Sequence, residues 1–229
     1  MIIDTHCHFD MMPQPEAYIS ESEAKGNIVI GMTNLPSHFA IGAPHVRGNK
    51  RIRLALGLHP LLAAENSKET AEFKNYVDQT SYIGEIGLDF SREGMATKDA
   101  QISVLREILA TLRGKKKIIS VHSRRAEREL LDLLIEYDIE NVVFHWYTGP
   151  IELIPAILER GYYFSVNEAM CQSKIGRAIL DRIPSDRILT ETDAPFNKKC
   201  DIHNLLTAIG LEKININQNF NNLLGRLRR

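Results

Sequence analysis

Residues of the types that bind divalent metals recur along this chain at the ends of short apolar segments. Imidazole nitrogens and carboxylate oxygens are common ligands of Zn²⁺ and of similar first-row ions. Six residues share this position: His6, His8, Glu85, His122, His145 and Asp193. Such a set predicts a metal-dependent hydrolase, provided that the fold brings the six side chains together.

The first two of these residues suit one ion by their spacing. Side chains two positions apart on a strand point to the same side, so His6 and His8 can reach a single ion. Glu85 lies in the apolar segment GEIGLD, where a buried carboxylate is costly unless it is paired or bound to a cation. A buried ion pair is the alternative for Glu85. Asp89, four residues later, is either a carboxylate behind the site or a helix cap.

The other three residues repeat one pattern. His122 ends the segment IISVH, His145 ends VVFH, and Asp193 lies in ILTETDAP. Taken singly, each histidine is more often a hydrogen-bonded core residue, and Asp193 is equally explained as a helix N-cap. Repetition of the pattern on several strands favours metal ligands. Glu191, two residues before Asp193, shares its side of the strand.

Short apolar segments alternate with amphipathic stretches over the whole chain. The expected strands are Ile2–Asp4, Ile28–Met32, Arg53–Leu58, Tyr82–Ile86, Ile118–Val121, Val142–Phe144, Tyr162–Val166 and Ile188–Thr192. The clearest expected helices are Lys98–Arg113, Arg125–Tyr137 and Ile151–Arg160. This alternation, with eight strands in 229 residues, predicts an α/β fold consisting of a single (β/α)8 TIM-type barrel domain over residues 1–229. The alternative is an open, doubly wound sheet.

In such a barrel the carboxyl ends of all strands meet at one rim, where the active site lies. Four imidazoles and two carboxylates are too many for one tetrahedral ion with an open position, so we expect two divalent metal ions. A nitrogen–oxygen set without thiolate suits Zn²⁺, Mn²⁺, Fe²⁺, Ni²⁺ or Co²⁺. Mg²⁺ is less natural with so many imidazoles, but it can be supplied with the substrate.

Two ions about 3.5–4 Å apart are the usual clamp for hydrolysing a phosphate ester. Our hypothesis assigns one ion to the N-terminal histidine pair with Asp193, and the other to His122 with His145. Glu85 bridges the two ions, and Asp193 accepts the proton of the attacking water. Arg124 is placed to bind a phosphate oxygen, with a surface arginine at a helix start as the alternative.

Composition limits the setting in which this chemistry occurs. The net charge is −1, so no overall field attracts nucleic acid. Cys7, Cys171 and Cys200 are odd in number and form no CxxC, which predicts free thiols in a reducing compartment. The N-terminus does not resemble a signal peptide, and no apolar run reaches the roughly 18 residues of a membrane span. We therefore expect a cytoplasmic protein without membrane contact, and a monomer by default.

Together these motifs resemble the TatD-type metal-dependent deoxyribonucleases of the amidohydrolase-like barrel superfamily. The matching segments are DTHCHFD at 4–10, GLHP at 57–60, GEIGLDF at 84–90, HSRRA at 122–126, HWYTG at 145–149 and ETDAP at 191–195. The resemblance implies a cytosolic metal-dependent phosphodiesterase acting on DNA, single-stranded or at ends, often as a 3′–5′ exonuclease. It carries the metal-ligand roles over to the six residues above. It also implies that His59, Arg124 and Glu191 bind substrate or support the ligands, so we count His59 and Arg124 with Glu85 and Asp193 as expected catalytic residues.

The chain departs from the family pattern in two places. Leu61 stands where the family usually has another histidine, which alters an expected phosphate contact. After ETDAP the chain is shorter by about one helix-and-loop unit, judged against the roughly 250-residue barrel norm. We therefore expect a barrel slightly shortened at its C-terminus, with an open or partner-covered rim where Lys198 and Lys199 replace lost positive charge. The opening THCHFDMMP and the shortened end also resemble the TatD-like component of the Qat anti-phage cassettes, which implies partner proteins and a role in defence.

Other functions stay open on the sequence alone. Amide or lactone hydrolysis uses similar ligands in the wider superfamily, but no lysine stands at a strand end where it could be carboxylated to bridge two metals. A partner-binding subunit with a vestigial site is a third interpretation, against which the complete ligand set argues. Aromatic residues near the rim serve either to stack on a terminal base or to pack: Phe9, Phe90, Trp146, Tyr147 and Phe196.

Overall fold

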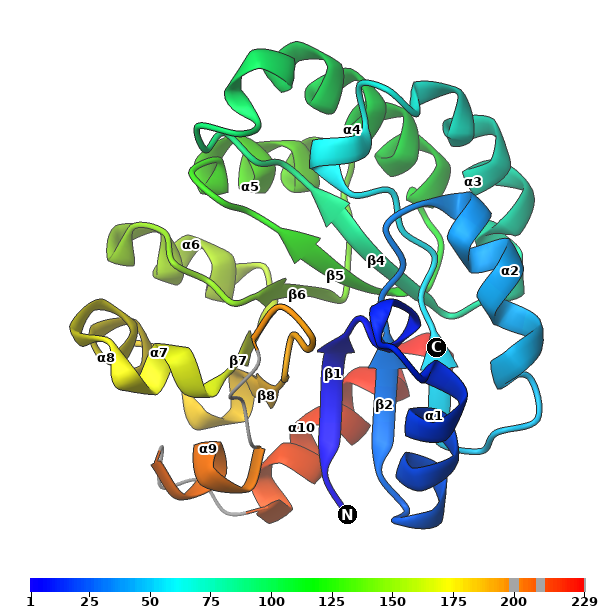
Figure 1. Cartoon of the computed structure of the whole chain (residues 1–229). Helices are drawn as coiled ribbons and strands as arrows, with labels where there is room; N and C mark the ends of the chain where they lie inside the picture. Colours follow the sequence, from blue (N-terminus) through cyan, green and yellow to red (C-terminus); the bar gives the residue numbers. More distant parts are fainter. Residues whose placement is uncertain (198–201, 209–212, 229) are drawn as a thin grey trace.

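The structure, a computed structural model, describes residues 1–197, 202–208 and 213–228. All eight expected strands are present: β1 (Ile3–Cys7), β2 (Ile28–Gly31), β3 (Ile52–Leu54), β4 (Tyr82–Gly87), β5 (Ile118–His122), β6 (Val142–His145), β7 (Tyr163–Val166) and β8 (Ile188–Thr190). The helices are α1 (Pro15–Ala24), α2 (Pro36–Val46), α3 (Thr70–Tyr76), α4 (Lys98–Leu112), α5 (Glu127–Glu136), α6 (Ile154–Glu159), α7 (Glu168–Gln172), α8 (Lys174–Leu180), α9 (Ile202–Ala208) and α10 (Lys213–Gly225). Helices surround the strands on the outside (Figure 1).

The strands pair in parallel and in the order of the sequence. β1, β2 and β3 form one sheet, and β4 to β8 form a second sheet. Parallel strands that each pair with the next along the chain, with helices outside, are the arrangement of a TIM-type barrel. The expected fold class is therefore confirmed, with the difference that the hydrogen-bonded sheet is not closed.

One interruption lies between β3 and β4. The third strand ends at Leu54 instead of continuing to the expected Leu58, and beyond it the chain meets β4 through an isolated bridge between Leu56 and Ile83. The amide of Gly84 donates to the carbonyl of Leu56 at 2.9 Å, so the two sheets still touch here. At Gly57 the chain passes so close to its neighbours that only glycine fits.

The other interruption lies between β8 and β1. Here the Thr5 hydroxyl donates to the carbonyl of Thr190 at 3.0 Å, and the amide of Asp193 donates to the carbonyl of His6 at 2.9 Å. β8 stops at Thr190 and not at the expected Thr192, because the amide of Thr192 bonds the carboxylate of Asp4 at 3.0 Å instead of a strand carbonyl. Contacts across both interruptions bring the two sheets side by side.

Two further boundaries differ from expectation. β1 continues to Cys7 and not merely to Asp4, so His6 lies within the strand. The expected helix Ile151–Arg160 begins as a 3₁₀ turn over Ile151–Leu153 and becomes α-helical only at Ile154. Pro155 explains this change, because it has no N–H to bond the carbonyl four residues earlier.

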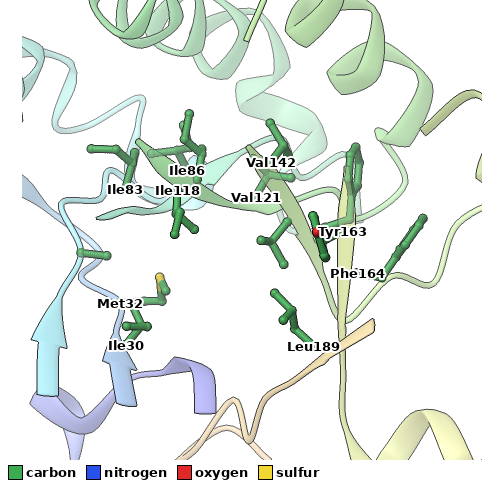
Figure 2. Packing of buried hydrophobic residues seen from close by; sticks show 14 of the residues in the cluster. Ile30, Met32, Ile83, Ile86, Ile118, Val121, Val142, Tyr163, Phe164 and Leu189 are labelled. Atoms are coloured by element: carbon green, nitrogen blue, oxygen red, sulfur yellow. The ribbon is translucent and has the colours of Figure 1, made fainter. Parts of the chain in front are cut away.

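Apolar side chains fill the space inside the strands. Figure 2 shows Ile30 of β2 and Met32, just after β2, pointing toward Tyr163 of β7 and Leu189 of β8. Phe164, the next residue of β7, points outward. Side chains alternate between the two sides of a strand, so residues two or four positions further along face the same interior. This apolar layer therefore supports the polar residues at the carboxyl ends of the strands.

Helix α10 is hydrogen-bonded to the start of β8. The side-chain nitrogen of Asn219 in α10 donates to the carbonyls of Ser185 (2.7 Å) and Ile188 (2.8 Å). Cys7 and Cys171 are buried free thiols, as expected, and Cys200 lies outside the described residues. None of the helices in the described ranges is long and apolar enough to cross a membrane.

Candidate metal centre

All six expected ligand residues converge at the carboxyl ends of the strands, around the carboxylate of Glu85. Its Oε1 lies 2.7 Å from His122 Nδ1 and 2.8 Å from His145 Nε2. Its Oε2 lies 3.2 Å from His8 Nε2. The two oxygens of one carboxylate thus face imidazoles from opposite parts of the chain.

The N-terminal histidines and Asp193 form a compact group on the Oε2 side. Asp193 Oδ1 lies 3.6 Å from His6 Nε2 and 3.7 Å from His8 Nε2, and the two imidazole nitrogens are 3.3 Å apart. His6, His8 and Asp193 are all buried, and their ligand atoms lie within 4.8 Å of one another. His6, Glu85 and His145 form a second group that meets the same limit.

Most of the imidazoles have a partner behind the ring. His6 Nδ1 lies 2.8 Å from the Ser120 hydroxyl, and His122 Nε2 lies 2.9 Å from Asp89 Oδ2. His145 Nδ1 faces the charge of Glu191 Oε2 at 3.7 Å, beyond hydrogen-bonding distance. Acceptors in these places fix the orientation and tautomer of a metal-binding imidazole. Of the two interpretations of Asp89, the carboxylate behind the site is thus the one that the geometry favours.

The supporting carboxylates are themselves held by hydrogen bonds. Glu191 is fully buried, and it accepts from the Ser165 hydroxyl and from Asn167 Nδ2 (2.9 Å). Asp89 Oδ1 accepts from the amide of Ser91 at 2.8 Å. These bonds replace the water that a buried carboxylate loses.

Charges in the centre are strongly coupled. Burial alone would raise the pKa of Glu85, yet the surrounding imidazoles, His145 foremost, hold it well below its usual range. Burial opposes protonation of His145, but the charges of Glu85 and Glu191 raise its pKa well above the usual range. Burial raises the pKa of Asp193 to about 7.

The donor atoms fit divalent ions. They are imidazole nitrogens and carboxylate oxygens, and they are buried in overlapping groups without a thiolate. Among the described residues, His8 Nδ1 and His145 Nδ1 are buried without a hydrogen-bond partner, and Nε2 of His6 lies 3.3 Å from Nε2 of His8. Such crowding of basic nitrogens is costly without a cation, so the residues present suit the metal chemistry that their types predict.

A cavity of about 830 Å³ opens above the centre. His59 lies on its wall with its ring centroid 5.0 Å from that of His122, and Arg124 lines it as an exposed side chain. The wall also has the polar residues Asn34 and His38, and a set of apolar side chains: Met11, Leu61, Leu62, Trp146 and Phe196. Lys198 and Lys199, expected at this rim, lie outside the described residues.

The structure separates the five candidate aromatic residues into two kinds. Phe9, Phe90 and Tyr147 are buried in the core, as packing residues are. Trp146 and Phe196 line the cavity, and Phe196 is 58% exposed with its ring edge-on to His8 at 5.1 Å. Of the five, only these two can contact a ligand in the cavity.

Two residues of the centre have backbone angles that L-amino acids rarely adopt. Asp193 has φ of 52° and Trp146 has φ of 38°. Left-handed backbone at non-glycine residues is strained and is found preferentially at functional sites. The backbone amide of Asp193 donates a hydrogen bond to the carbonyl of His6, which holds this conformation and directs the carboxylate toward the histidines.

Asp4 contributes to the centre although no role was expected for it from the sequence. It is fully buried, and its carboxylate accepts from the amide of Thr192 (3.0 Å) and from the Thr192 hydroxyl (2.6 Å). This fixes the segment that presents Asp193. The signal was its spacing, since Asp4 lies two residues before His6 on one side of β1.

Comparisons with known proteins agree with this geometry. A fold of parallel strands and outer helices, with histidines and carboxylates at one rim, is the arrangement expected of a metal-dependent hydrolase of the barrel type. The sequence profile of the family described as TatD related DNase matches residues 3–216, and the chain belongs to this family. The resemblance stated from the motifs is thereby confirmed.

Individual relatives carry related names. An uncharacterised metal-dependent hydrolase of Buchnera aphidicola is 28% identical over 208 residues, covering 85% of this chain and 78% of the relative. The human deoxyribonuclease TATDN3 is 27% identical over 214 residues, with the same coverage of 85% and 78%. A 3′-5′ ssDNA/RNA exonuclease TatD of Dickeya dadantii is 31% identical over 155 residues, covering 64% of this chain and 58% of the relative.

Solved structures support the fold. The crystal structure of YJJV, a TatD homologue from Escherichia coli, superposes with a TM-score of 0.84 at 23% identity, covering 99% of this chain and 97% of that chain. A TatD family hydrolase from Entamoeba histolytica gives a TM-score of 0.73 at 18% identity, covering 98% and 97%.

Proposed function

We propose that this chain hydrolyses phosphodiester bonds of DNA with two divalent metal ions, acting as a 3′–5′ exonuclease on single strands or ends. The observation that carries the proposal is the position of Glu85, whose two oxygens face the N-terminal histidine pair and the pair His122 and His145. The exonuclease name of the Dickeya relative supports the direction of attack.

The ligand assignment follows the two sides of Glu85. His6, His8 and Asp193 would hold one ion, and His122 and His145 the other, with Glu85 shared. Bound divalent ions polarise the phosphate and make water a stronger nucleophile at neutral pH. Zn²⁺, Mn²⁺, Ni²⁺ and Co²⁺ suit the imidazole-rich donor set, and Mg²⁺ is the fifth candidate.

Residues of the chain supply the remaining functions. Asp193 faces the cavity beside both N-terminal histidines, where its carboxylate can take the proton from an attacking water. Arg124, on the cavity wall, can pair with a phosphate oxygen through its guanidinium. Trp146 and Phe196 provide flat apolar surfaces of the kind on which bases stack.

A metal titration of nuclease activity tests the proposal. DNA labelled at the 5′ or the 3′ end, single- or double-stranded, is incubated with the chelated protein and each divalent metal, beside an Asp193→Asn variant. We expect activity that requires added metal, is lost in the variant, and shortens DNA from its 3′ end. Absence of cleavage with every metal, in a protein that binds two ions, would contradict the proposal.

The other predictions from the sequence need tests of their own. Turnover of a lactone panel without any phosphodiester cleavage would favour the amide or lactone hydrolase. Partner proteins of a defence cassette predict co-purification and loss of phage protection in the Asp193→Asn variant. Cytoplasmic location and a monomeric state also stay predictions, which cell fractionation and light scattering measure.

A further inference from the structure

Gln101 is a buried amide side chain that lies outside the metal centre, near the start of α4. Only 1% of it is exposed, and both ends of its side chain are hydrogen-bonded. Its Oε1 accepts from the backbone amide of Asp89 at 2.8 Å, and its Nε2 donates to the carbonyl of Gly94 (2.8 Å) and to the hydroxyl of Thr97 (3.0 Å). A backbone N–H only donates and a carbonyl only accepts, so these partners fix which end of the amide is the oxygen.

The segment that Gln101 holds connects β4 to α4 and folds back on itself. The amides of Gly94 and Met95 both donate to the carbonyl of Ser91, at 3.1 and 2.9 Å. Gly94 comes so close to Asp89 that a Cβ on Gly94 would lie 2.0 Å from the carbonyl oxygen of Asp89. Gln101 bonds both sides of this close approach at once, so it fixes the one relative to the other.

Asp89 is the residue through which this segment reaches the centre. Its Oδ2 lies 2.9 Å from His122 Nε2, and its Oδ1 accepts from the amide of Ser91 at 2.8 Å. The carboxylate can meet the imidazole only if the backbone of Asp89 stays in place, because an aspartate side chain is short.

The backbone of Asp89 is held from two sides. The amides of Leu88 and Phe90 donate to carbonyls at and just beyond the end of β5, at 2.9 Å each. The amide of Asp89 donates instead to Gln101. A buried backbone N–H without a partner is costly, so Gln101 supplies an acceptor that this amide needs.

We propose that Gln101 is a positioning residue of the metal centre, which holds Asp89 so that its carboxylate stays behind the imidazole of His122. This role rests on the proposed metal centre, with His122 as one of its ligands. Groups behind a ligand change metal affinity because they fix the orientation of the ligating side chain. Gln101 is one step further from the ion, and it acts through Asp89. The alternative is a buried amide that only stabilises the fold.

A double-mutant cycle in zinc affinity distinguishes the two. Gln101→Met keeps the length of the side chain and removes both hydrogen-bonding ends, whereas Asp89→Ala removes the carboxylate. In the chelated protein titrated with Zn²⁺, we expect Gln101→Met to weaken one of the two sites by about 10-fold, the lower end of the loss for a group behind a ligand. In the Asp89→Ala background the same substitution should change the affinity by less than about twofold, because its route to the ion is already lost. Equal losses in both backgrounds, or no loss in the first, would overturn the proposal.

Gln101→Glu tests which end of the side chain matters. It keeps an oxygen for the amide of Asp89 and removes the N–H donors to Gly94 and Thr97, so zinc affinity should recover most of what Gln101→Met loses. A loss as large as that of Gln101→Met would refute a role through Asp89. Gln172→Met is the matched control, because Gln172 is an exposed glutamine of α7 that bonds Glu168 at 3.1 Å, and it should bind zinc as wild type does.

Amide hydrogen exchange in the metal-free protein needs neither metal nor substrate. The amide of Asp89 should exchange faster in Gln101→Met than in wild type, while the amides of Leu88 and Phe90 keep their rates. Unchanged exchange at Asp89 would contradict the proposal, and so would faster exchange at all three amides, which would show a general loosening of the fold. A wild type that binds no zinc would refute the metal centre together with this role. If two ions bind with the expected cycle but DNA stays intact, only the phosphodiesterase function fails.

Discussion

Glu85 should control how strongly metal ions stabilise this protein. Glu85→Gln keeps the size and one oxygen of the side chain but removes the charge that faces both histidine pairs. Two ions, each present at 100 times its Kd, add about 5 kcal/mol to the free energy of unfolding. For a chain of 229 residues this corresponds to a rise in Tm of about 10–20 °C.

The variant should lose most of this stabilisation. Removing a partner behind a ligand typically costs up to about 100-fold in metal affinity, and losing a ligand itself should cost at least as much. Each ion would then be present near its Kd and contribute about 0.4 kcal/mol, so the metal-induced rise in Tm should fall to about 2–3 °C.

Thermal unfolding with and without Mn²⁺, each against a chelator baseline, measures the difference directly. The baseline removes the separate effect of the lost hydrogen bonds to His122 and His145. Glu127→Gln is the matched control, because Glu127 is a buried carboxylate whose Oε1 accepts from the amide of Arg125 (3.1 Å). The reasoning is refuted if Glu85→Gln keeps the full rise while binding two ions.

The site and its support lead to three further predictions. Metal binding should release protons and weaken as pH falls, because Glu85 and Glu191 raise the pKa of His145 in the metal-free protein and the ion must displace that proton. Calorimetry in buffers of different ionisation enthalpy measures the release, and no release at low pH would contradict it. Phe196→Ala should raise KM for DNA about tenfold through lost stacking, but it should not raise KM for DNA with an abasic terminal residue. Ile41 is an exposed side chain on α2 that does not line the cavity, so an equal effect of Ile41→Ala would argue against stacking. Gly57→Ala should lower the free energy of unfolding by about 3 kcal/mol, since its Cβ would lie 1.8 Å from the carbonyl oxygen of Thr33. In Gly48→Ala the new Cβ has open space, so a matching loss of stability there would show that crowding is not the cause.

The elements of this fold could be predicted because their signal is local. A strand buried on both faces needs a short run of apolar residues, and a helix on a barrel needs one apolar side, so both patterns are readable along the chain. Boundaries were less predictable. The third strand ends at Leu54, and the eighth ends at Thr190 because the amide of Thr192 bonds Asp4, which is far away in sequence.

The convergence of the six candidate ligands was also predictable, because histidines and carboxylates that recur at the ends of buried strands would be costly to bury without a shared cation. Their partition between two ions stays a hypothesis: Glu85 turns one oxygen toward each histidine pair, but His6 also lies in one group with Glu85 and His145. The role of Asp4 was missed. A single acidic residue in an apolar strand does not reveal which distant amide it will bind.

The sequence by itself determined the kind of chemistry available here, because residue types and their place relative to apolar segments are local properties. Only the tertiary structure decided what each ring nitrogen can do. Asp89 lies behind His122, whereas a backbone amide lies behind His59. These two histidines each follow or end an apolar strand, yet a carboxylate faces one ring and an N–H donor faces the other. That difference depends on hydrogen bonds from other segments, which no pattern along the chain specifies.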